Sequence, residues 1–223
     1  MTPPTASTPF RAVLWDFGGV VLTSPFEAFA RYEAELGLPT GFIRTVNATN
    51  PDANAWARLE RSELDLAGFA RAFEVEARAL DATGVAEALV GERVIELLAG
   101  EIRPQMVATL DALKAHGLKI ACLTNNIPGS GSGDPERGAR VGQVMARFDA
   151  VVESSKVGVR KPEPRFYEMA CEMLSVPPHQ CVFLDDLGIN LKPAKAMGMT
   201  TIKVGNPDVA IVELEGHLGL SLR

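Results

Sequence analysis

The sequence predicts an α/β protein with a doubly wound parallel sheet and an inserted, all-helical lobe. After residue 100, short apolar segments alternate with helical segments, which is typical of a parallel sheet with helices on both faces. One further apolar segment, residues 11–15, stands alone near the start of the chain. About 80 residues of helical character separate it from the others, and an inserted helical lobe explains that gap better than a loop of this length.

The expected domain boundaries follow from these patterns. Residues 1–10 are rich in Pro and Thr, and we expect them to form a disordered tail. We assign residues 11–23 and 101–223 to an α/β core domain and residues 24–100 to the helical lobe. Within the lobe, apolar residues share a helical face at Phe26, Phe29 and Ala30, and again at Leu66, Phe69, Ala70 and Phe73. Gly, Pro and Asn at 37–39 and 47–51 predict breaks between its helices.

Helices and strands alternate in the remainder of the predicted core. We expect helices near 105–116, 138–147, 164–174 and 190–197, and strands near 118–123, 148–152, 181–184 and 200–204. Gly117 and Gly198 stand where a left-handed residue ends a helix, and Pro162 or Pro164 can begin the third helix. The Gly-Ser repeat at 129–133 lacks the spacing of a phosphate-binding loop, and we interpret it as a flexible linker or the edge of a lid.

The composition excludes several classes of protein. The 223 residues are 47% hydrophobic, which suits one sizeable core with a small second lobe. The net charge is −6, and the sequence lacks the basic stripe that is typical of nucleic-acid-binding proteins. No apolar stretch is long enough to span a membrane, and the first residues do not resemble a signal peptide. The cysteines Cys122, Cys171 and Cys181 lie in apolar segments, as expected for buried thiols in a reducing compartment. We expect a soluble, cytoplasmic protein that is a monomer or a homodimer.

Polar residues follow several of the predicted strands. Asp16 follows the first strand, the pair Thr124-Asn125 follows the second, and the pair Asp185-Asp186 follows a later one. In open parallel sheets, ligands bind beyond the carboxyl ends of the strands. We therefore expect these side chains to converge on one pocket, which Lys161, just before a predicted helix, can also reach.

The residue types at this edge suit phosphate chemistry. The carboxylates of Asp16 and Asp186 are suitable ligands for Mg²⁺. Thr124 and Asn125 can donate hydrogen bonds to phosphate oxygens, and Lys161 adds a positive charge. Aspartate is also a known nucleophile for phosphoryl transfer. Each residue alone is readily explained as a turn, helix-capping or surface residue, but their combination predicts an active site.

Four short motifs stand in the order that characterises a known family. They are Asp16-Phe17-Gly18-Gly19-Val20, Leu123-Thr124-Asn125, Lys161-Pro162, and Phe183-Leu184-Asp185-Asp186 with Asn190. On these motifs the sequence resembles the haloacid dehalogenase-like hydrolases. Residues 157–164 and 183–194 are similar to a subgroup that includes the N-terminal phosphatase-like domain of soluble epoxide hydrolase and the related domain of an acyl-CoA dehydrogenase family. The resemblance implies a Rossmann-like core, with residues 24–100 as a cap domain.

The resemblance also implies a magnesium site and its ligands. Asp16 would be both the nucleophile and a metal ligand. Gly18 would bind the metal through its backbone carbonyl. Asp186 would be the carboxylate ligand of the last motif, with Asp185 and Asn190 in support.

The remaining motif positions imply how a substrate would be held. Thr124 and Asn125 would hold the transferring phosphoryl group. Lys161 would balance charge between that group and Asp16. The implied partner is a small phosphorylated substrate.

Gly18 departs from the family pattern. Family phosphatases usually have an aspartate here, which acts as general acid for the leaving group and as base for water. Such assistance contributes about 10²–10⁴ in rate. We therefore expect weakened or altered turnover, unless a good leaving group, a cap residue or water substitutes. Some relatives that act as phosphatases also have Asp-x-Gly, so Gly18 alone does not predict an inactive protein.

These observations predict a Mg²⁺-dependent hydrolase of small phosphomonoesters that forms an aspartyl-phosphate on Asp16. One alternative is a catalytically weak phosphate-binding or interaction module, with Gly18 marking the loss of activity. Another is a metal-independent 2-haloacid dehalogenase. The acid pair Asp185-Asp186 disfavours the second alternative, because that branch of the family has an uncharged segment of Ser-Asn type there.

One segment of the helical lobe allows two interpretations. Trp56, Arg58, Glu60 and Arg61 precede a predicted break at 62–65. The segment could face the core and select the substrate. A solvated helix end is the more common arrangement of such residues, and we favour it here.

Overall fold

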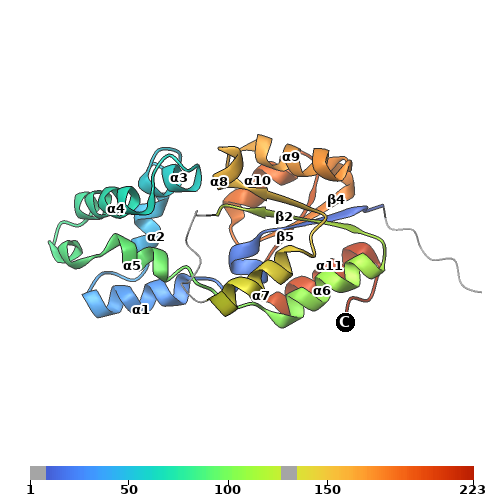
Figure 1. Cartoon of the computed structure of the whole chain (residues 1–223), viewed down its shortest axis with the longest axis horizontal. Coiled ribbons are helices and arrows are strands. Elements are labelled where there is room, and N and C mark those ends of the chain that lie inside the picture. The colour runs from blue at the N-terminus through green and yellow to red at the C-terminus, as the bar shows by residue number, and fades with distance from the viewer. Residues whose placement is uncertain (1–8, 127–134) are drawn as a thin grey trace, which may run out of the picture.

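The computed structural model describes residues 9–126 and 135–223, and its central feature is a five-stranded parallel sheet (Figure 1). The strands are β1 (Ala12–Trp15), β2 (Lys119–Thr124), β3 (Ala150–Glu153), β4 (Cys181–Asp185) and β5 (Thr200–Lys203). Their order is β3-β2-β1-β4-β5, and all neighbouring strands are parallel. The predicted doubly wound sheet is confirmed, with β1 as its central strand.

The register of the sheet brings three strand ends together. Trp15 of β1 is paired with Cys122 on one side and with Leu184 on the other. All residues of β1 are fully buried, as expected for an apolar strand between two neighbours. Because the strands run in one direction, the carboxyl ends of β1, β2 and β4 lie at the same edge of the sheet.

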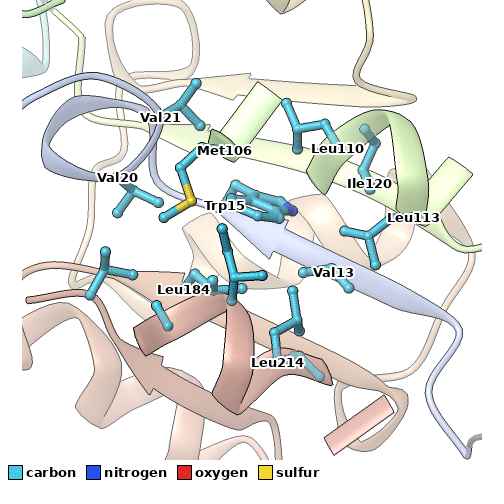
Figure 2. Close-up of a cluster of buried hydrophobic side chains, with 14 of the residues drawn as sticks. Val13, Trp15, Val20, Val21, Met106, Leu110, Leu113, Ile120, Leu184 and Leu214 are labelled. Carbon is cyan, nitrogen blue, oxygen red and sulfur yellow. The ribbon is translucent and has the colours of Figure 1, made fainter. Parts of the chain in front are cut away.

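Helices cover both faces of the sheet (Figure 1). One face packs against α6 (Pro104–Ala115), α7 (Pro135–Met145) and α11 (Pro207–Leu218), and the other against α9 (Pro164–Leu174) and α10 (Gly188–Ala196). Alternation along β1 sends Val13 and Trp15 to the first face and Leu14 to the second. Figure 2 shows Trp15 between Met106 and Leu110 on the first face.

The structure differs from the prediction in a few elements. Helix α11 extends the fold beyond the last predicted strand, and Asn206 caps it by accepting hydrogen bonds from the backbone N–H groups of Asp208 and Val209. Asn-Pro at 206–207 is the sequence signal for that start. The single turn α8 (Ser154–Val157) follows β3, and the short 3₁₀ turn η3 (Pro178–Gln180) precedes β4. Residues 1–8 of the predicted tail and the Gly-Ser segment 129–133 lie outside the described residues.

The helical lobe has a hydrophobic core of its own. It consists of α1 (Phe26–Leu36), α2 (Phe42–Ala48), α3 (Ala55–Glu60), α4 (Leu66–Leu80), the 3₁₀ turn η2 (Val85–Ala88) and α5 (Gly91–Glu96). Phe29, Ile43, Leu59, Phe69 and Phe73 are buried among these helices. In Figure 1 the lobe lies beside the sheet, at the end where α3 faces α8. The domain boundaries at 23/24 and 100/101 remain a prediction.

The two connections between lobe and core run side by side. The backbone N–H of Thr23 donates to the Glu101 carbonyl at 2.8 Å, and that of Arg103 donates to the Val21 carbonyl at 2.9 Å. Leu22 and Ile102 form an isolated antiparallel bridge between these hydrogen bonds. Both connections therefore join the core at one place. Among the described residues, we find no helix with the length and apolar character of a membrane span.

Candidate active site

Asp16 lies at the carboxyl end of the central strand. The tight turn Phe17–Val21 follows it, and Asp16 Oδ1 accepts a hydrogen bond from the Phe17 backbone N–H at 2.6 Å. The residue is only 8% exposed. Burial raises the pKa of Asp16 well above its usual value, and although Lys161 opposes this shift, Asp185 and Asp186 add to it.

Lys161 provides the positive charge that a buried carboxylate requires. Its Nζ lies 2.8 Å from Asp16 Oδ1 and 2.8 Å from Asp185 Oδ2, and the residue is 1% exposed. Burial alone would lower the pKa of Lys161, but the two carboxylates outweigh burial and raise it. The lysine therefore stays charged and holds Asp16 in place.

Asp185 is occupied by protein donors on both of its oxygens. Oδ1 accepts hydrogen bonds from the Leu187 backbone N–H at 2.8 Å and from Asn190 Nδ2 at 3.0 Å. Oδ2 accepts from Lys161 Nζ and, at 3.0 Å, from Asn190 Nδ2. Tyr167 in turn donates to the Asn190 carbonyl at 2.7 Å. Asp185 thus orients Lys161, while Asn190 orients Asp185.

Asp186 completes a cluster of three carboxylates. Each of Asp16, Asp185 and Asp186 offers one carboxylate oxygen, and these three oxygens lie within 4.8 Å of one another. Burial and then Asp185 raise the pKa of Asp186 to about 6, against the opposing effect of Lys161. Three carboxylates with a single buried lysine leave an excess of negative charge that fits a divalent cation. Since Asp185 is already saturated by hydrogen bonds, Asp16 and Asp186 are the better placed ligands.

Thr124 and Asn125 lie where β2 ends, beside the same cavity. Thr124 is buried and lines the cavity. The Asn125 amide is engaged by protein groups, because Nδ2 donates to the Lys161 carbonyl at 3.0 Å and to Glu60 Oε2 at 3.3 Å. Asn125 Oδ1 accepts from the Lys161 backbone N–H at 2.9 Å. The Asn125 side chain is therefore hydrogen-bonded to both the backbone N–H and the carbonyl of Lys161.

Gly18 also lines the cavity, with room for a side chain. Its φ of −70° and ψ of 133° are accessible to any residue, and a β-carbon would have nothing within 4 Å. Backbone geometry therefore does not require glycine at this position, and space is open where a β-carbon would lie.

The cavity between core and helical lobe has a volume of about 630 Å³. Seven of the eight predicted site residues line this cavity, namely Asp16, Gly18, Thr124, Asn125, Lys161, Asp186 and Asn190. Asp185 does not line it but contacts Lys161 and Asn190, which do. The lobe contributes apolar wall from Phe26, Phe29 and Trp56. The Arg44 guanidinium lies 4.3 Å above the Phe26 ring and also borders the cavity.

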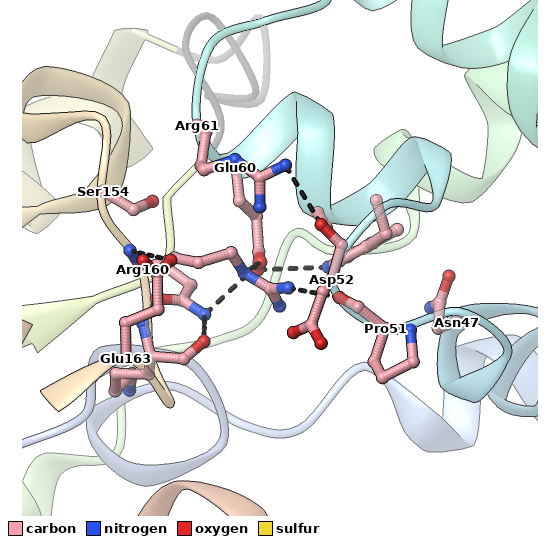
Figure 3. A network of polar contacts seen from close by, with 12 residues as sticks. Asn47, Pro51, Asp52, Glu60, Arg61, Ser154, Arg160 and Glu163 are labelled. Atoms are coloured by element: carbon pink, nitrogen blue, oxygen red, sulfur yellow. Dashed lines mark hydrogen bonds and ion pairs between the residues drawn. The ribbon is translucent and has the colours of Figure 1, made fainter.

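The favoured interpretation of the segment at 56–61 is wrong at Glu60. Glu60 is only 5% exposed, and its Oε2 lies 2.5 Å from Arg160 Nε of the core. The contact lacks the alignment of a hydrogen bond and is an ion pair. Figure 3 shows Glu60 and Arg160 facing each other, with Pro51 of the lobe also contacting Arg160. The helix end is buried because it docks on the core, which its local pattern does not reveal.

Residues 10–198 match the family model described as haloacid dehalogenase-like hydrolase. The chain belongs to this family. It is therefore a hydrolase, as the sequence predicts. Acyl-CoA dehydrogenase family member 10 of Mus musculus is 34% identical over 218 residues, which cover 96% of this chain and 20% of that protein. Bifunctional epoxide hydrolase 2 of Sus scrofa is 31% identical over 219 residues, which cover 95% of this chain and 39% of that protein.

Solved structures of haloacid dehalogenase-like proteins share the fold. A crystal structure described as a dehalogenase has a TM-score of 0.62 and 21% identity, covering 95% of this chain and 98% of that one. A HAD family enzyme from Bacteroides thetaiotaomicron, in complex with magnesium and inorganic phosphate, has a TM-score of 0.55 and 17% identity, covering 88% of this chain and 96% of that one. The curated relatives are longer, and the chain spans only about a fifth and two fifths of their lengths.

Proposed function

We propose that this haloacid dehalogenase-like hydrolase is a Mg²⁺-dependent phosphatase of small phosphomonoesters, with Asp16 as its nucleophile. The observation that carries the proposal is the placement of Asp16. It is a buried carboxylate at the cavity, held by Lys161 and beside a second carboxylate, Asp186. A protein with the same fold was crystallised with magnesium and inorganic phosphate, which supports the same chemistry here.

Each side chain of the site has a separate role in the proposed reaction. Asp16 and Asp186 would hold Mg²⁺, which when bound neutralises charge between the carboxylate and the phosphate. An Asp16 oxygen attacks phosphorus, the bond from phosphorus to the leaving oxygen breaks, and an aspartyl-phosphate forms. Lys161 stays beside Asp16 and stabilises the negative charge of the transferred group. Water then attacks the aspartyl-phosphate, which releases inorganic phosphate and regenerates Asp16.

The leaving oxygen needs a proton that position 18 does not supply. Gly18 carries no side chain, so the proton for the leaving oxygen comes from water or is not needed when the leaving group is a weak base. We infer that the enzyme prefers phosphates with good leaving groups. Simple alkyl phosphates, whose alkoxides are strong bases, would react slowly.

Phosphate release from a panel of sugar, lipid, nucleotide and aryl phosphates tests the proposal. We expect turnover that requires Mg²⁺, stops with a chelator, and is lost in Asp16→Asn. Asp208→Asn, an exposed aspartate at the start of α11, is the matched control and should retain full activity. Activity that survives in Asp16→Asn would exclude this mechanism.

The binding-module alternative is favoured by one observation, the absence of a proton donor at Gly18. Calorimetric titration with Mg²⁺ and a phosphate analogue, run beside the turnover assay, separates the two functions. Binding without turnover on the whole panel would favour the module. Activity on a 2-haloacid in the presence of chelator would instead indicate a dehalogenase.

A further inference from the structure

A carboxylate of the helical lobe reaches into the core beside the site. Glu60 is the last residue of α3, and its Oε1 accepts a hydrogen bond from Trp56 Nε1 at 3.1 Å. Its Oε2 contacts both Arg160 and Asn125 of the core. Burial raises the pKa of Glu60, with Arg160 opposing that shift. A buried carboxylate without these partners would be strongly unfavourable, so the partners determine where it sits.

The partner that matters for the site is Asn125. One amide hydrogen bond of Asn125 goes to Glu60 and another to the Lys161 carbonyl, while its oxygen accepts from the Lys161 N–H. The side chain therefore ties the lobe directly to the backbone of the residue that holds Asp16. Removal of Glu60 frees one side of this amide.

We propose that Glu60 is a positioning residue, which fixes Asn125 and, through it, the Lys161 backbone at the geometry the reaction uses. The inference rests on the proposed function for its catalytic consequence. Lys161 Nζ is 2.8 Å from the Asp16 nucleophile, so a displacement of its backbone alters that contact. The alignment of the nucleophile therefore depends on the docking of the lobe on the core.

Two further contacts bring the lobe to the same part of the core. Arg160 Nη1 donates to the Pro51 carbonyl at 2.9 Å, and Ser62 Oγ donates to the Ser155 carbonyl at 2.9 Å. These contacts hold the lobe on the core, but neither involves Asn125 or Lys161. Their presence explains why loss of Glu60 alone is expected to disturb the site locally while the lobe stays docked.

Hydrogen exchange of the Lys161 backbone N–H tests the inference without any assay of turnover. In Glu60→Ala we expect at least about a tenfold loss of protection at Lys161, while strand amides of Leu14 and Phe183 remain protected. Glu63→Ala is the matched control, since Glu63 is half-exposed and pairs only locally with Arg61. Unchanged protection at Lys161, or an equal loss at the strand amides, would overturn the proposal.

Kinetics with para-nitrophenyl phosphate test the catalytic consequence. We expect Glu60→Ala to lower kcat about 10-fold to 100-fold, with a smaller change in KM, because the nucleophile is misaligned. In an Asn125→Ala background the same substitution should change kcat by less than about threefold, since its path of action is already absent. Glu60→Leu has a similar size and no side-chain oxygen to accept from Asn125, so it carries the test if Glu60→Ala does not fold.

The outcomes separate the inference from the proposed function. A wild-type protein without turnover contradicts the proposed function, and the exchange measurement then decides the positioning role on its own. An active wild-type protein whose kcat is unchanged in Glu60→Ala overturns the positioning role alone. Effects of Glu60→Ala and Asn125→Ala that simply multiply would also overturn it.

Discussion

Gly19 and Asp186 are in direct contact across the site, and no side chain fits between them. A β-carbon at Gly19 would lie 2.3 Å from Asp186 Oδ2. Gly19 also has a φ of +76°, which residues with a side chain rarely adopt. Gly19 therefore allows the tight turn that follows Asp16, and its lack of a side chain leaves the space that the Asp186 carboxylate occupies.

Substitution of Gly19 should damage the metal site directly. We expect Gly19→Ala to weaken Mg²⁺ binding at least about tenfold, because the new methyl group displaces the Asp186 carboxylate. Gly117→Ala is the control, since Gly117 has a similar φ of +78° but open space where a β-carbon would lie. Calorimetric titration with Mg²⁺ measures both variants. Unchanged affinity in Gly19→Ala would contradict the assignment of Asp186 as a ligand.

Asp186 should make metal binding and stability depend on pH. Its folded pKa is about 6, above the value of 3.8 for an ordinary aspartate, so the metal-free folded state holds this proton more tightly. The corresponding stability is present below about pH 4 and is lost as the pH rises through about 6. Mg²⁺ requires the ionised form, so its affinity should fall below pH 6.

The measurement is the melting temperature from pH 4 to 8, with and without Mg²⁺. We expect Mg²⁺ to raise the melting temperature near pH 7.5 and to have little effect near pH 5. Asp186→Asn should remove most of this difference. A stabilisation by Mg²⁺ that is independent of pH would argue against the raised pKa.

Restoring a carboxylate at position 18 should broaden the range of leaving groups. We expect Gly18→Asp to raise turnover of alkyl phosphates by up to about 10²–10⁴-fold, with little gain for para-nitrophenyl phosphate, which needs no proton. The free space at Gly18 should allow the side chain without refolding of the turn. Gly18→Asn has a similar size and no acid, so it should not reproduce the gain. An equal effect on both substrates would indicate a cause other than proton transfer.

Loss of Lys161 should destabilise the protein strongly. Lys161→Ala leaves Asp16 and Asp185 without their shared cation, and breaking a buried ion pair in this way costs about 3–5 kcal/mol. Urea unfolding in the absence of metal measures the loss. Lys156→Ala removes a mostly exposed lysine that pairs with Glu153, and should change stability by less than about 0.5 kcal/mol. Similar losses in both variants would show that the buried lysine has no special role.

Much of the candidate site could be predicted because parallel strands end at the same edge of a sheet. Asp16 and Asp185 are separated by most of the chain, yet each directly follows or ends an apolar strand, and their convergence needs only the topology. Helix α11 shows the opposite case. The pair Asn206-Pro207 is a local signal for the start of this helix, but the predicted elements ended with the strand at 200–204 and did not include it.

The sequence by itself determined the doubly wound sheet, the inserted helices and the polar residues at the strand ends. Apolar periodicity and the position of each motif relative to its strand carry that information locally. The tertiary structure alone decided that Asp185 is saturated by Lys161 and Asn190, and that Glu60 is buried against Arg160 and Asn125. Lys161, Asp185 and Asn190 meet through packing within the core, whereas Glu60 meets Arg160 and Asn125 because the helical lobe docks on the core. No local pattern in a short helix end encodes a partner 100 residues away.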